Sequence, residues 1–476
     1  MSPDLSPSGT VAAESTTEWK DKKRYLWMIG LVVPSLVFVA IGLYFLTEWS
    51  VFLWTGPIMI FVIVPIFDLI FGRDDSNPPE EVIEELSNDR YYRWITFLFI
   101  PLQLAAFVWS MYLIATQDWP IVAKVGLAIS TGMVGGIAIN TAHELGHKRE
   151  KHERWLSKVA LSQTAYGHFY IEHNRGHHVR VSTPEDPASS RMGQSFYRFW
   201  PRTVWGSLTS AWNLEANRYR RKDQHPFRPG NDVLNAWAMT VVLWGALLIW
   251  LGIGILPYLL IQAVIGFSLL EIVNYLEHYG LKRRKVGKAG RERYERVLPE
   301  HSWNANNIPT NVLLYHLQRH SDHHANPTRR YQTLRDYAES PVLPTGYAGM
   351  ILVALIPPWW SRVMDPKVVA HYGGDIRLAN VEPSKFDKLV RKYPLPADEV
   401  IDQTATATDT SRQDHGDDVA AARCPGCAYV YEVAVGNEAE GFPAGTPWSQ
   451  IPDDWTCPDC GVREKVDFLA LKESPL

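Results

Sequence analysis

Residues 121–149 read IVAKVGLAISTGMVGGIAINTAHELGHKR, a long apolar run that ends in two histidines. Its apolar part, 121–139, approaches the roughly 20 residues that an α-helix needs to cross a bilayer. The run leads into His143 and His147, which are four residues apart and therefore lie on one helix face. The stretch predicts a membrane helix with two histidines at its mouth.

Further apolar runs of similar length predict a bundle of six membrane helices. Charged residues are nearly absent from the runs, and Trp residues lie near their ends as in an aromatic belt, which argues against a soluble apolar core. Asp68 lies inside one run close to its basic end, where we expect a solvated position. The runs are 26–46, 51–71, 94–116, 121–139, 234–255 and 256–275.

Lys and Arg are distributed unevenly between the two ends of these runs. The connections 47–50, 117–120 and 252–257 contain neither residue. By the positive-inside rule we expect a multi-pass protein of a bacterial-type inner (plasma) membrane, with both termini and the polar segments on the cytoplasmic side. The basic residues of the other ends are Lys20, Lys22, Lys23, Arg24, Arg73, Arg90, Arg93, Lys148, Arg149 and the stretch 282–285.

Fourteen of the sixteen histidines lie between His143 and His324. A metal ion needs several neutral imidazoles from different elements, and a pair one helical turn apart supplies two of them. A ligand set made chiefly of nitrogen suits iron, copper or zinc. The histidines occur as His143-Glu-Leu-Gly-His147, His173-Asn-Arg-Gly-His177-His178 and His320-Ser-Asp-His323-His324, and His278 follows the last apolar run.

Two stretches carry narrower signatures, Asn274-Tyr-Leu-Glu-His-Tyr-Gly280 and Leu317-Gln-Arg-His-Ser-Asp-His-His-Ala325. They resemble the NYxEHYG and LQRHSDHHA motifs of integral-membrane alkane 1-monooxygenases (alkane hydroxylases), a family of histidine-rich membrane di-iron enzymes. The resemblance covers roughly residues 20 to 390. It implies two non-haem irons and O2 as cosubstrate, and leaves open which histidine binds which iron. The implied ligands are His143, His147, His173, His177, His178, His278, His320, His323 and His324.

Several neighbours of these histidines are weaker candidates. Four carboxylates beside the ligands are candidates to accept the second ring N–H of a bound histidine, and ordinary solvated charge is the alternative for each. His316 lies one turn before His320, but the family pattern begins at His320. His152 and His168 are expected at the surface or in supporting positions. The four carboxylates are Glu144, Glu172, Glu277 and Asp322.

The only cysteines, in Cys424-Pro-Gly-Cys427 and Cys457-Pro-Asp-Cys460, form a four-thiolate metal signature. Their spacing alone fits a zinc ribbon or an iron site. The residues around them, about 422–470, resemble a rubredoxin, whose pattern contains CxxCGY, PGT and IPDDWxCPxCG. This implies one Fe(Cys)4 centre that carries one electron. Ala428 stands where that pattern has glycine, which tolerates positive φ better than alanine does.

Charge separates the tail from the body. Residues 396–423 carry a net charge of -5 and residues 424–476 carry -6, so the total of -4 leaves +7 on residues 1–395. We expect the acidic rubredoxin to dock on the basic body. The basic residues we expect to take part are Arg175, Arg180, Lys282, Arg283 and Arg319.

The chain therefore divides into an N-terminal cytoplasmic segment (1–24), a membrane di-iron monooxygenase domain (25–395), a flexible acidic linker (396–421) and a rubredoxin domain (422–476). The predicted fold is mainly α, a six-transmembrane-helix bundle with a helical cytoplasmic histidine-rich layer, plus the small rubredoxin-like metal domain.

The resemblance implies terminal hydroxylation of n-alkanes, taken from the lipid phase, to 1-alcohols with O2 and two electrons delivered through the fused rubredoxin. The chain has no dinucleotide-binding fingerprint after a strand, so the resemblance also implies a separate NAD(P)H-dependent rubredoxin reductase. No nucleic-acid partner is expected. Trp54 and Phe61 are candidates to limit the length of the alkane. Two alternatives stay open: a membrane fatty-acyl desaturase or hydroxylase, and a non-catalytic membrane metal sensor or transporter with a zinc ribbon.

Overall fold

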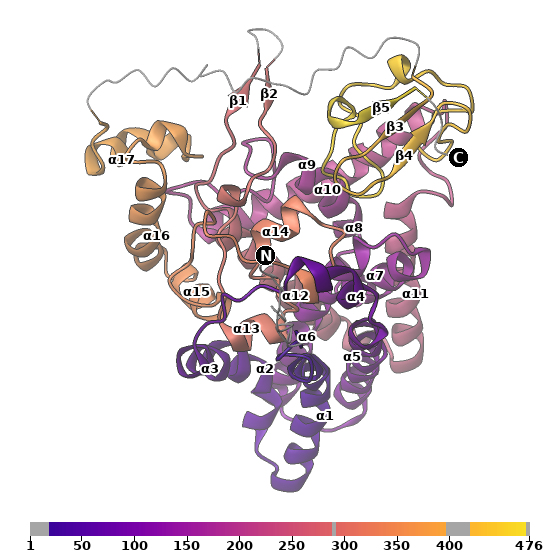
Figure 1. Ribbon diagram of the computed structural model, residues 1–476. Helices are drawn as coiled ribbons and strands as arrows, with labels where there is room; N and C mark the ends of the chain where they lie inside the picture. The colour runs from indigo at the N-terminus through magenta and orange to yellow at the C-terminus, as the bar shows by residue number, and fades with distance from the viewer. Residues whose placement is uncertain (1–18, 288–291, 397–418, 473–476) are drawn as a thin grey trace, which may run out of the picture.

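The computed structural model describes residues 19–287, 292–396 and 419–472 (Figure 1). Most of the predicted N-terminal segment and nearly all of the predicted linker lie outside these residues. Within the described residues, six helical segments are long and apolar enough to cross a membrane, which confirms the predicted multi-pass bundle. The segments are Leu26–Thr47, Ser50–Phe71, Arg90–Thr116, Ile121–Gly146, Asp232–Leu251 and Ile253–His278.

The membrane helices occupy the lower part of Figure 1, where α1, α3 and α5 are labelled. The second span is a composite, since a π-helical turn, Met59–Ile63, separates its two α-helical parts. The helices of the spans are α1 (Ile29–Thr47), α2 (Thr55–Ile58), α3 (Val64–Phe71), α5 (Arg90–Thr116), α6 (Ile121–Gly146), α11 (Asp232–Leu251) and α12 (Leu256–His278).

Polar caps define where two of these helices begin. The Asp89 side chain accepts a hydrogen bond from the backbone N–H of Tyr91 at the start of α5. The Asn231 side chain accepts from the backbone N–H groups of Val233 and Leu234, the second and third residues of α11. Such caps satisfy donors that the helix itself leaves unpaired. At the other end, α11 stops at Gly252. This residue has a φ of 86°, which glycine adopts without strain because it has no β-carbon.

α6 and α12 pack closely because small residues face one another between them. A β-carbon added to Gly132 of α6 would lie 2.5 Å from the backbone oxygen of Gln262 in α12. One added to Gly136 would lie 2.9 Å from the backbone oxygen of Gly266. Small residues are what allows two membrane helices to approach so closely. The approach brings together the ends of α6 and α12, which carry His143 and His278.

A layer of shorter elements covers the upper end of the bundle (Figure 1). It confirms the predicted helical, histidine-rich layer, and short 3-10 turns connect many of its elements. Its elements are α4 (Ile83–Asn88), α7 (Lys151–Ser162), α8 (Phe169–Ile171), a π-helical turn (Glu172–His177), α9 (His178–Arg180), α10 (Phe196–Arg220), β1 (Lys285–Val286), β2 (Arg293–Tyr294), α13 (Ile308–Leu313), α14 (His320–Ala325), α15 (Tyr347–Ala354), α16 (Pro357–His371) and α17 (Phe386–Lys392).

The C-terminal residues form a small antiparallel sheet at the upper right of Figure 1. Its central strand β3 (Ala421–Arg423) pairs with β4 (Val430–Glu432) on one side and β5 (Leu469–Leu471) on the other. Ala422 pairs with Tyr431 and with Ala470. An aromatic core fills the domain, formed by Tyr431, Phe442, Trp448, Trp455 and Phe468.

Asp68 differs from its predicted solvated position, because only 1% of the residue is exposed. Its carboxylate accepts hydrogen bonds from the backbone N–H of Thr310, at 3.0 Å, and from the Thr310 hydroxyl, at 2.5 Å. Thr310 lies in the first turn of α13, where N–H groups lack helical partners. Asp68 therefore fastens the second span to α13. The residues next to Asp68 in the sequence give no sign of this partner, so its burial was not predicted.

We predict that Gly132→Leu destabilises the protein by about 1–3 kcal/mol, since the new side chain must push α12 away from α6. The thermal unfolding midpoint of the detergent-solubilised protein measures this. Gly245→Leu on α11 is the matched control, since a β-carbon there meets nothing within 4 Å. Equal midpoints for the two variants would contradict the account of the α6–α12 contact.

Candidate metal centre

The structure gathers all nine predicted histidines into two buried clusters. Within each cluster one ring nitrogen per histidine lies within 4.8 Å of the others. The five-histidine cluster contains His143, His147, His173, His178 and His323. The four-histidine cluster contains His177, His278, His320 and His324. This division gives a grouping of the nine histidines in space that the sequence alone does not give.

The spacing of the ring nitrogens fits a metal ion in each cluster. In the five-histidine cluster, Nε2 of His323 lies 2.8 Å from that of His143 and 3.0 Å from that of His178. In the four-histidine cluster, Nε2 of His320 lies 2.9 Å from that of His324 and 3.3 Å from that of His278. With metal–nitrogen bonds of about 2.1 Å, two ligands at right angles lie about 3 Å apart.

The protonation state of the rings also fits metal binding. Burial lowers the pKa of the cluster histidines outside the spans well below the ordinary value, so these imidazoles are neutral at physiological pH. The neutral ring is the form that binds a metal. The Nε2 atoms of His147 and His177 are buried without a protein partner. The histidines with lowered pKa are His147, His173, His178, His320, His323 and His324.

Three pairs of histidines were predicted at i, i+4 spacing. In two of these pairs both members lie in the same cluster, and in the third pair they do not. His143 and His147 share the five-histidine cluster, and His320 and His324 share the four-histidine cluster. His173, however, meets His178, with 3.0 Å between their Nε2 atoms.

A π-helical turn explains the exception. The backbone N–H of His178 donates to the carbonyl of His173, five residues earlier, so these two side chains lie above one another. His177 is thereby turned into the other cluster. His323, predicted to join His320 and His324, lies in the five-histidine cluster instead. The six residues 173–178 thus supply ligand candidates to both clusters.

The carboxylates near the clusters differ from one another in what they contact. Oε2 of Glu277 lies 3.2 Å from Nε2 of His320, on the side where the ring nitrogens meet. Glu144 pairs with Lys148 at 3.0 Å, and Asp322 accepts from Arg329 at 2.9 Å.

Glu172 contacts Arg180 at 2.8 Å, and burial raises the pKa of Glu172 to about 8. Of the four carboxylates, Glu277 is therefore the one that contacts a cluster histidine.

Asp186 is a residue that the sequence reasoning missed. Its Oδ2 lies 2.9 Å from Nδ1 of His177, so a proton on Nδ1 leaves Nε2 free to face the four-histidine cluster. Carboxylates placed in this way fix the tautomer and orientation of metal ligands. Asp186 also accepts from the Ser189 hydroxyl at 2.6 Å. It lies in a loop without periodicity, so no sequence signal pointed to it.

The histidines outside the predicted set have other roles. His316 contacts the Tyr331 carbonyl through Nδ1 and the Lys23 amine through Nε2. His152 is exposed, as expected. His168 is buried, and this burial lowers its pKa to about 4.

His301 lies near Glu295 and Glu300. Its Nδ1 accepts from the Leu298 N–H, so Nε2 carries a proton. Nε2 lies 3.4 Å from Oε1 of Glu295, toward which it points that proton.

The four cysteines fit a tetrahedral metal site. Sγ of Cys424 lies 3.8 Å from that of Cys460, and Sγ of Cys427 lies 3.5 Å from that of Cys457. Metal–sulfur bonds of about 2.3 Å in a tetrahedron place sulfur atoms about 3.8 Å apart. Ala428 has a φ of 59°, so the position does require the left-handed backbone that the usual glycine adopts readily.

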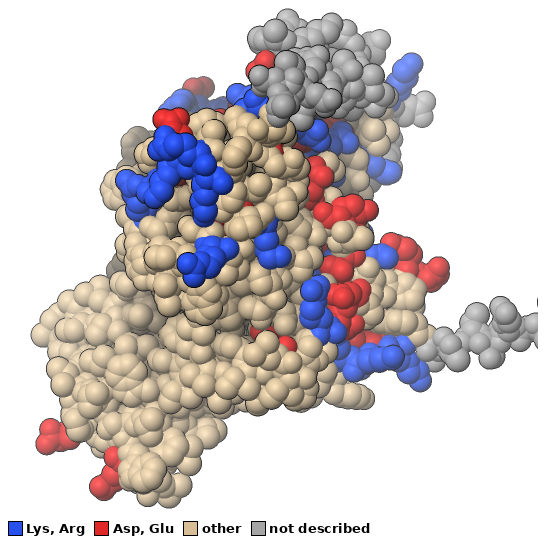
Figure 2. All heavy atoms as spheres, turned by 90° about the vertical axis from the view of Figure 1, so that its left-hand side faces the viewer, with Lys and Arg blue, Asp and Glu red and all other residues tan. Residues whose placement is uncertain are grey.

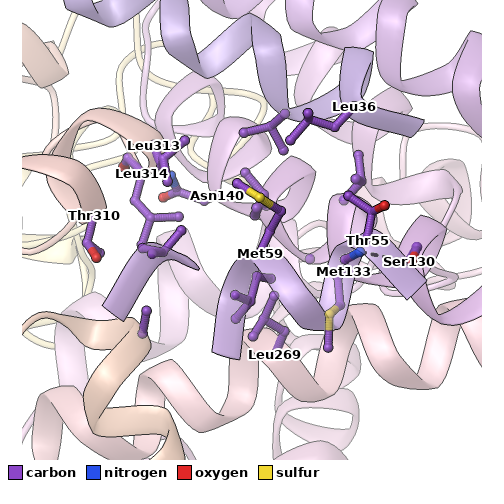
Figure 3. A pocket seen from close by; sticks show the side chains of 18 of the residues that line it. Leu36, Thr55, Met59, Ser130, Met133, Asn140, Leu269, Thr310, Leu313 and Leu314 are labelled. Atoms are coloured by element: carbon purple, nitrogen blue, oxygen red, sulfur yellow. Dashed lines mark hydrogen bonds between the residues drawn. The ribbon is translucent and has the colours of Figure 1, made fainter. Parts of the chain in front are cut away.

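An apolar cavity runs through the bundle toward the histidine layer. Figure 3 shows Asn140 and Leu314 at one end, Thr55 and Ser130 at the other, and Met59 between them. Residues of α1, the second span, α6, α12, α13 and α15 line it.

The upper end of the cavity adjoins the clusters along the chain. Asn140 precedes His143 by three residues, Leu317 precedes His320 by three, and both line the cavity. Asn140 and His143 both lie in α6, where one helical turn is about 5.4 Å, so the cavity ends close below the ligand candidates.

Comparison with known proteins supplies the family. Residues 118–354 match the fatty acid desaturase family, and residues 421–468 match the rubredoxin family. An alkane 1-monooxygenase from Acinetobacter baylyi is 48% identical over 381 residues, which are 79% of this chain and 92% of that relative. The chain belongs to the alkane 1-monooxygenase family. Alkane 1-monooxygenases from Pseudomonas putida and Ectopseudomonas oleovorans are each 44% identical, over 83% and 80% of this chain and 98% and 94% of those relatives.

Membership in the alkane 1-monooxygenase family confirms the resemblance and makes the chain an oxidoreductase. The desaturase match is a relationship at family level, and it covers the part of the chain with the histidine motifs. The rubredoxin match favours iron over zinc for the four cysteines. It also supports electron transfer within one chain. A non-catalytic sensor or transporter has no support among these relatives.

We predict that Asp186→Asn lowers the affinity of the four-histidine cluster for iron by about 10–100-fold, because His177 loses the carboxylate that orients it. Titration of the metal-free protein with ferrous iron under anaerobic conditions measures this. Glu185→Gln is the matched control, since that neighbouring carboxylate is exposed and contacts the Tyr294 hydroxyl. Unchanged affinity in Asp186→Asn would remove the orienting role.

Proposed function

We propose that this chain hydroxylates n-alkanes at the terminal carbon, with one non-haem iron in each histidine cluster. The substrate R–CH3, O2, two electrons and two protons yield R–CH2OH and water. The observation that carries this proposal is the position of two buried histidine clusters at the end of an apolar cavity. The di-iron pair, when bound, supplies reductive activation of O2 and the attack on the C–H bond.

The protein's own residues hold and orient the reactants. An alkane offers no charge or polar group for recognition, so shape and dryness must position it. Met59, Val134 and Leu269 form apolar walls, and Val32 of α1 lines the cavity while 46% of it is exposed on the lipid-facing side. A hydrocarbon can therefore enter from the lipid phase and lie lengthwise with one end toward the irons.

The residues that limit the chain length differ from those first suggested. Neither Trp54 nor Phe61 is among the lining residues. The indole of Trp54 packs against Gly126 of α6, and Phe61 packs against the core around α15 and α16. Leu127 and Ser130 line the end farther along α6 from His143. We therefore assign the far end of the cavity to these two residues.

The proposed setting is the inner membrane, with the histidine layer and both termini in the cytoplasm. Its support is the distribution of charge. In Figure 2 the lower apolar part shows a few Asp and Glu at its bottom, while Lys and Arg gather above it. This distribution follows the positive-inside rule. We retain the division at residues 25–395, 396–421 and 422–476, with an NAD(P)H-dependent reductase as the external electron source.

One experiment tests the function directly. The purified chain, loaded with iron, is given a chemical reductant, O2 and either an n-alkane or a fatty-acyl substrate, and the products are identified by mass spectrometry. The proposal expects the 1-alcohol, with one oxygen atom from labelled O2. An unsaturated acyl product and no alcohol would instead support the desaturase alternative.

We predict that Val134→Trp shortens the range of alkanes accepted, because it fills the middle of the cavity and leaves only the part next to the irons. Turnover of the longest alkanes should fall about tenfold or more, while short alkanes are retained. Product analysis across a series of chain lengths measures this. Val242→Trp, at a lipid-facing position that is 71% exposed, is the control. An unchanged chain-length range would exclude this cavity as the substrate site.

A further inference from the structure

The rubredoxin domain contacts the membrane body through three acidic residues that meet arginines. Asp459 lies 3.4 Å from Arg154 and 3.6 Å from Arg149. The second of these acids, Glu440, lies 3.1 Å from Arg221 and 3.5 Å from Arg175.

The third acid, Asp467, lies 2.8 Å from Arg296. The three acids come from separate parts of the domain, so together their ion pairs fix its orientation and not only its proximity.

The arginines used differ from most of those expected. Of the predicted set, Arg175 pairs with Glu440 of the rubredoxin domain, whereas Arg283 donates to the Val179 and Glu295 carbonyls. Arg180 is engaged with Glu172, and Lys282 donates to the Arg377 carbonyl. Arg319 is fully buried and donates to the Leu334, Asp74 and Ser76 carbonyls. The net charge of the body indicated that the rubredoxin domain docks on it. Net charge could not indicate which arginines are available for docking and which are engaged within the body.

Between these ion pairs, one cysteine loop touches the histidine layer. Gly461, which directly follows Cys460, is buried against Asn174, and a β-carbon added to Gly461 would overlap the Asn174 backbone oxygen. Asn174 is the residue after His173 in the π-helical turn.

The two cysteine loops are not equivalent in their surroundings. Pro425, Gly426 and Ala428 of the first loop are exposed. Gly461 of the second loop is buried, and Asp459 is partly covered. The second loop thus faces the body, and the first faces away from it.

We propose that electrons leave the rubredoxin iron through the Cys457–Cys460 loop and enter the five-histidine cluster at Asn174. This deepens the proposed function, on which it rests, by naming the point of electron entry. Each passage oxidises the rubredoxin iron by one electron and reduces one iron of the histidine site by one electron. Two passages, with one recharge of the rubredoxin by its reductase between them, supply each O2. Asn174 and Gly461 are positioning residues, since they set the distance between donor and acceptor.

The variant Gly461→Ala tests this contact. The added methyl group forces the loop away from Asn174 by about 1 Å or more, since overlapping atoms must separate to contact distance. The iron–thiolate absorption of the reduced full-length protein is followed after mixing with O2 and alkane. We expect its reoxidation to slow about tenfold or more. Amide hydrogen exchange should also show less protection of residues 457–463 in the variant.

Gly445→Ala is the matched control. Gly445 has a φ of 85°, similar to the 67° of Gly461, but a β-carbon there meets nothing within 4 Å. Both variants therefore strain the backbone, and only Gly461→Ala disturbs the contact. Alanine is already accommodated at a φ of 59° in Ala428, after the first cysteine pair. Equal reoxidation rates in Gly461→Ala and Gly445→Ala would overturn the proposal.

A second variant guards against a folding defect in Gly461→Ala. Asp459→Lys leaves the backbone unstrained and places a positive charge beside Arg149 and Arg154, so reoxidation of the rubredoxin iron should slow. Adding Arg154→Glu to this variant should restore part of the rate. No slowing in Asp459→Lys would also overturn the proposal. Hydroxylation driven by a chemical reductant bypasses the rubredoxin and should stay at the parental level. Its failure in the parent protein would contradict the proposed function and not the entry point.

Discussion

The arrangement of this protein depends on nine buried imidazoles whose ring nitrogens converge on two points. A polar atom buried without a partner destabilises a protein by about 1–3 kcal/mol. Several of these nitrogens have no protein partner beyond one another, and low dielectric keeps the rings neutral. Under the proposed function, a metal ion in each cluster would give these nitrogens a partner. The packed ends of α6 and α12, the π-helical turn and α14 are placed so that this convergence is possible.

This histidine layer lies between the apolar cavity and the rubredoxin domain. Below it lies the apolar cavity between the membrane helices, through which we propose that hydrocarbon enters from the lipid. Above it, the acidic rubredoxin domain rests on arginines of the body. Residues 173–178 contribute to both histidine clusters and also carry Asn174, which touches the rubredoxin. One short segment therefore connects electron entry to the two candidate iron sites.

Sequence reasoning found what depends on local pattern. Apolar length gave the spans, and fixed spacing gave the nine histidines and four cysteines. It could not foresee that a π-helical turn pairs His173 with His178, because i, i+4 spacing favours His177. Asp68 was misplaced because its partner Thr310 is distant in the chain. Asp186 was missed because it lies in a loop without periodicity. The docking arginines depended on which basic side chains the fold leaves free, and composition does not contain that information.

The most direct test of the account is X-ray absorption at the iron edge, combined with metal analysis, on protein produced with ample iron. The account predicts two irons per chain in a shell of nitrogen and oxygen ligands, in addition to one iron bound only by sulfur. Zinc in the histidine sites, or iron found only in the sulfur environment, would contradict it.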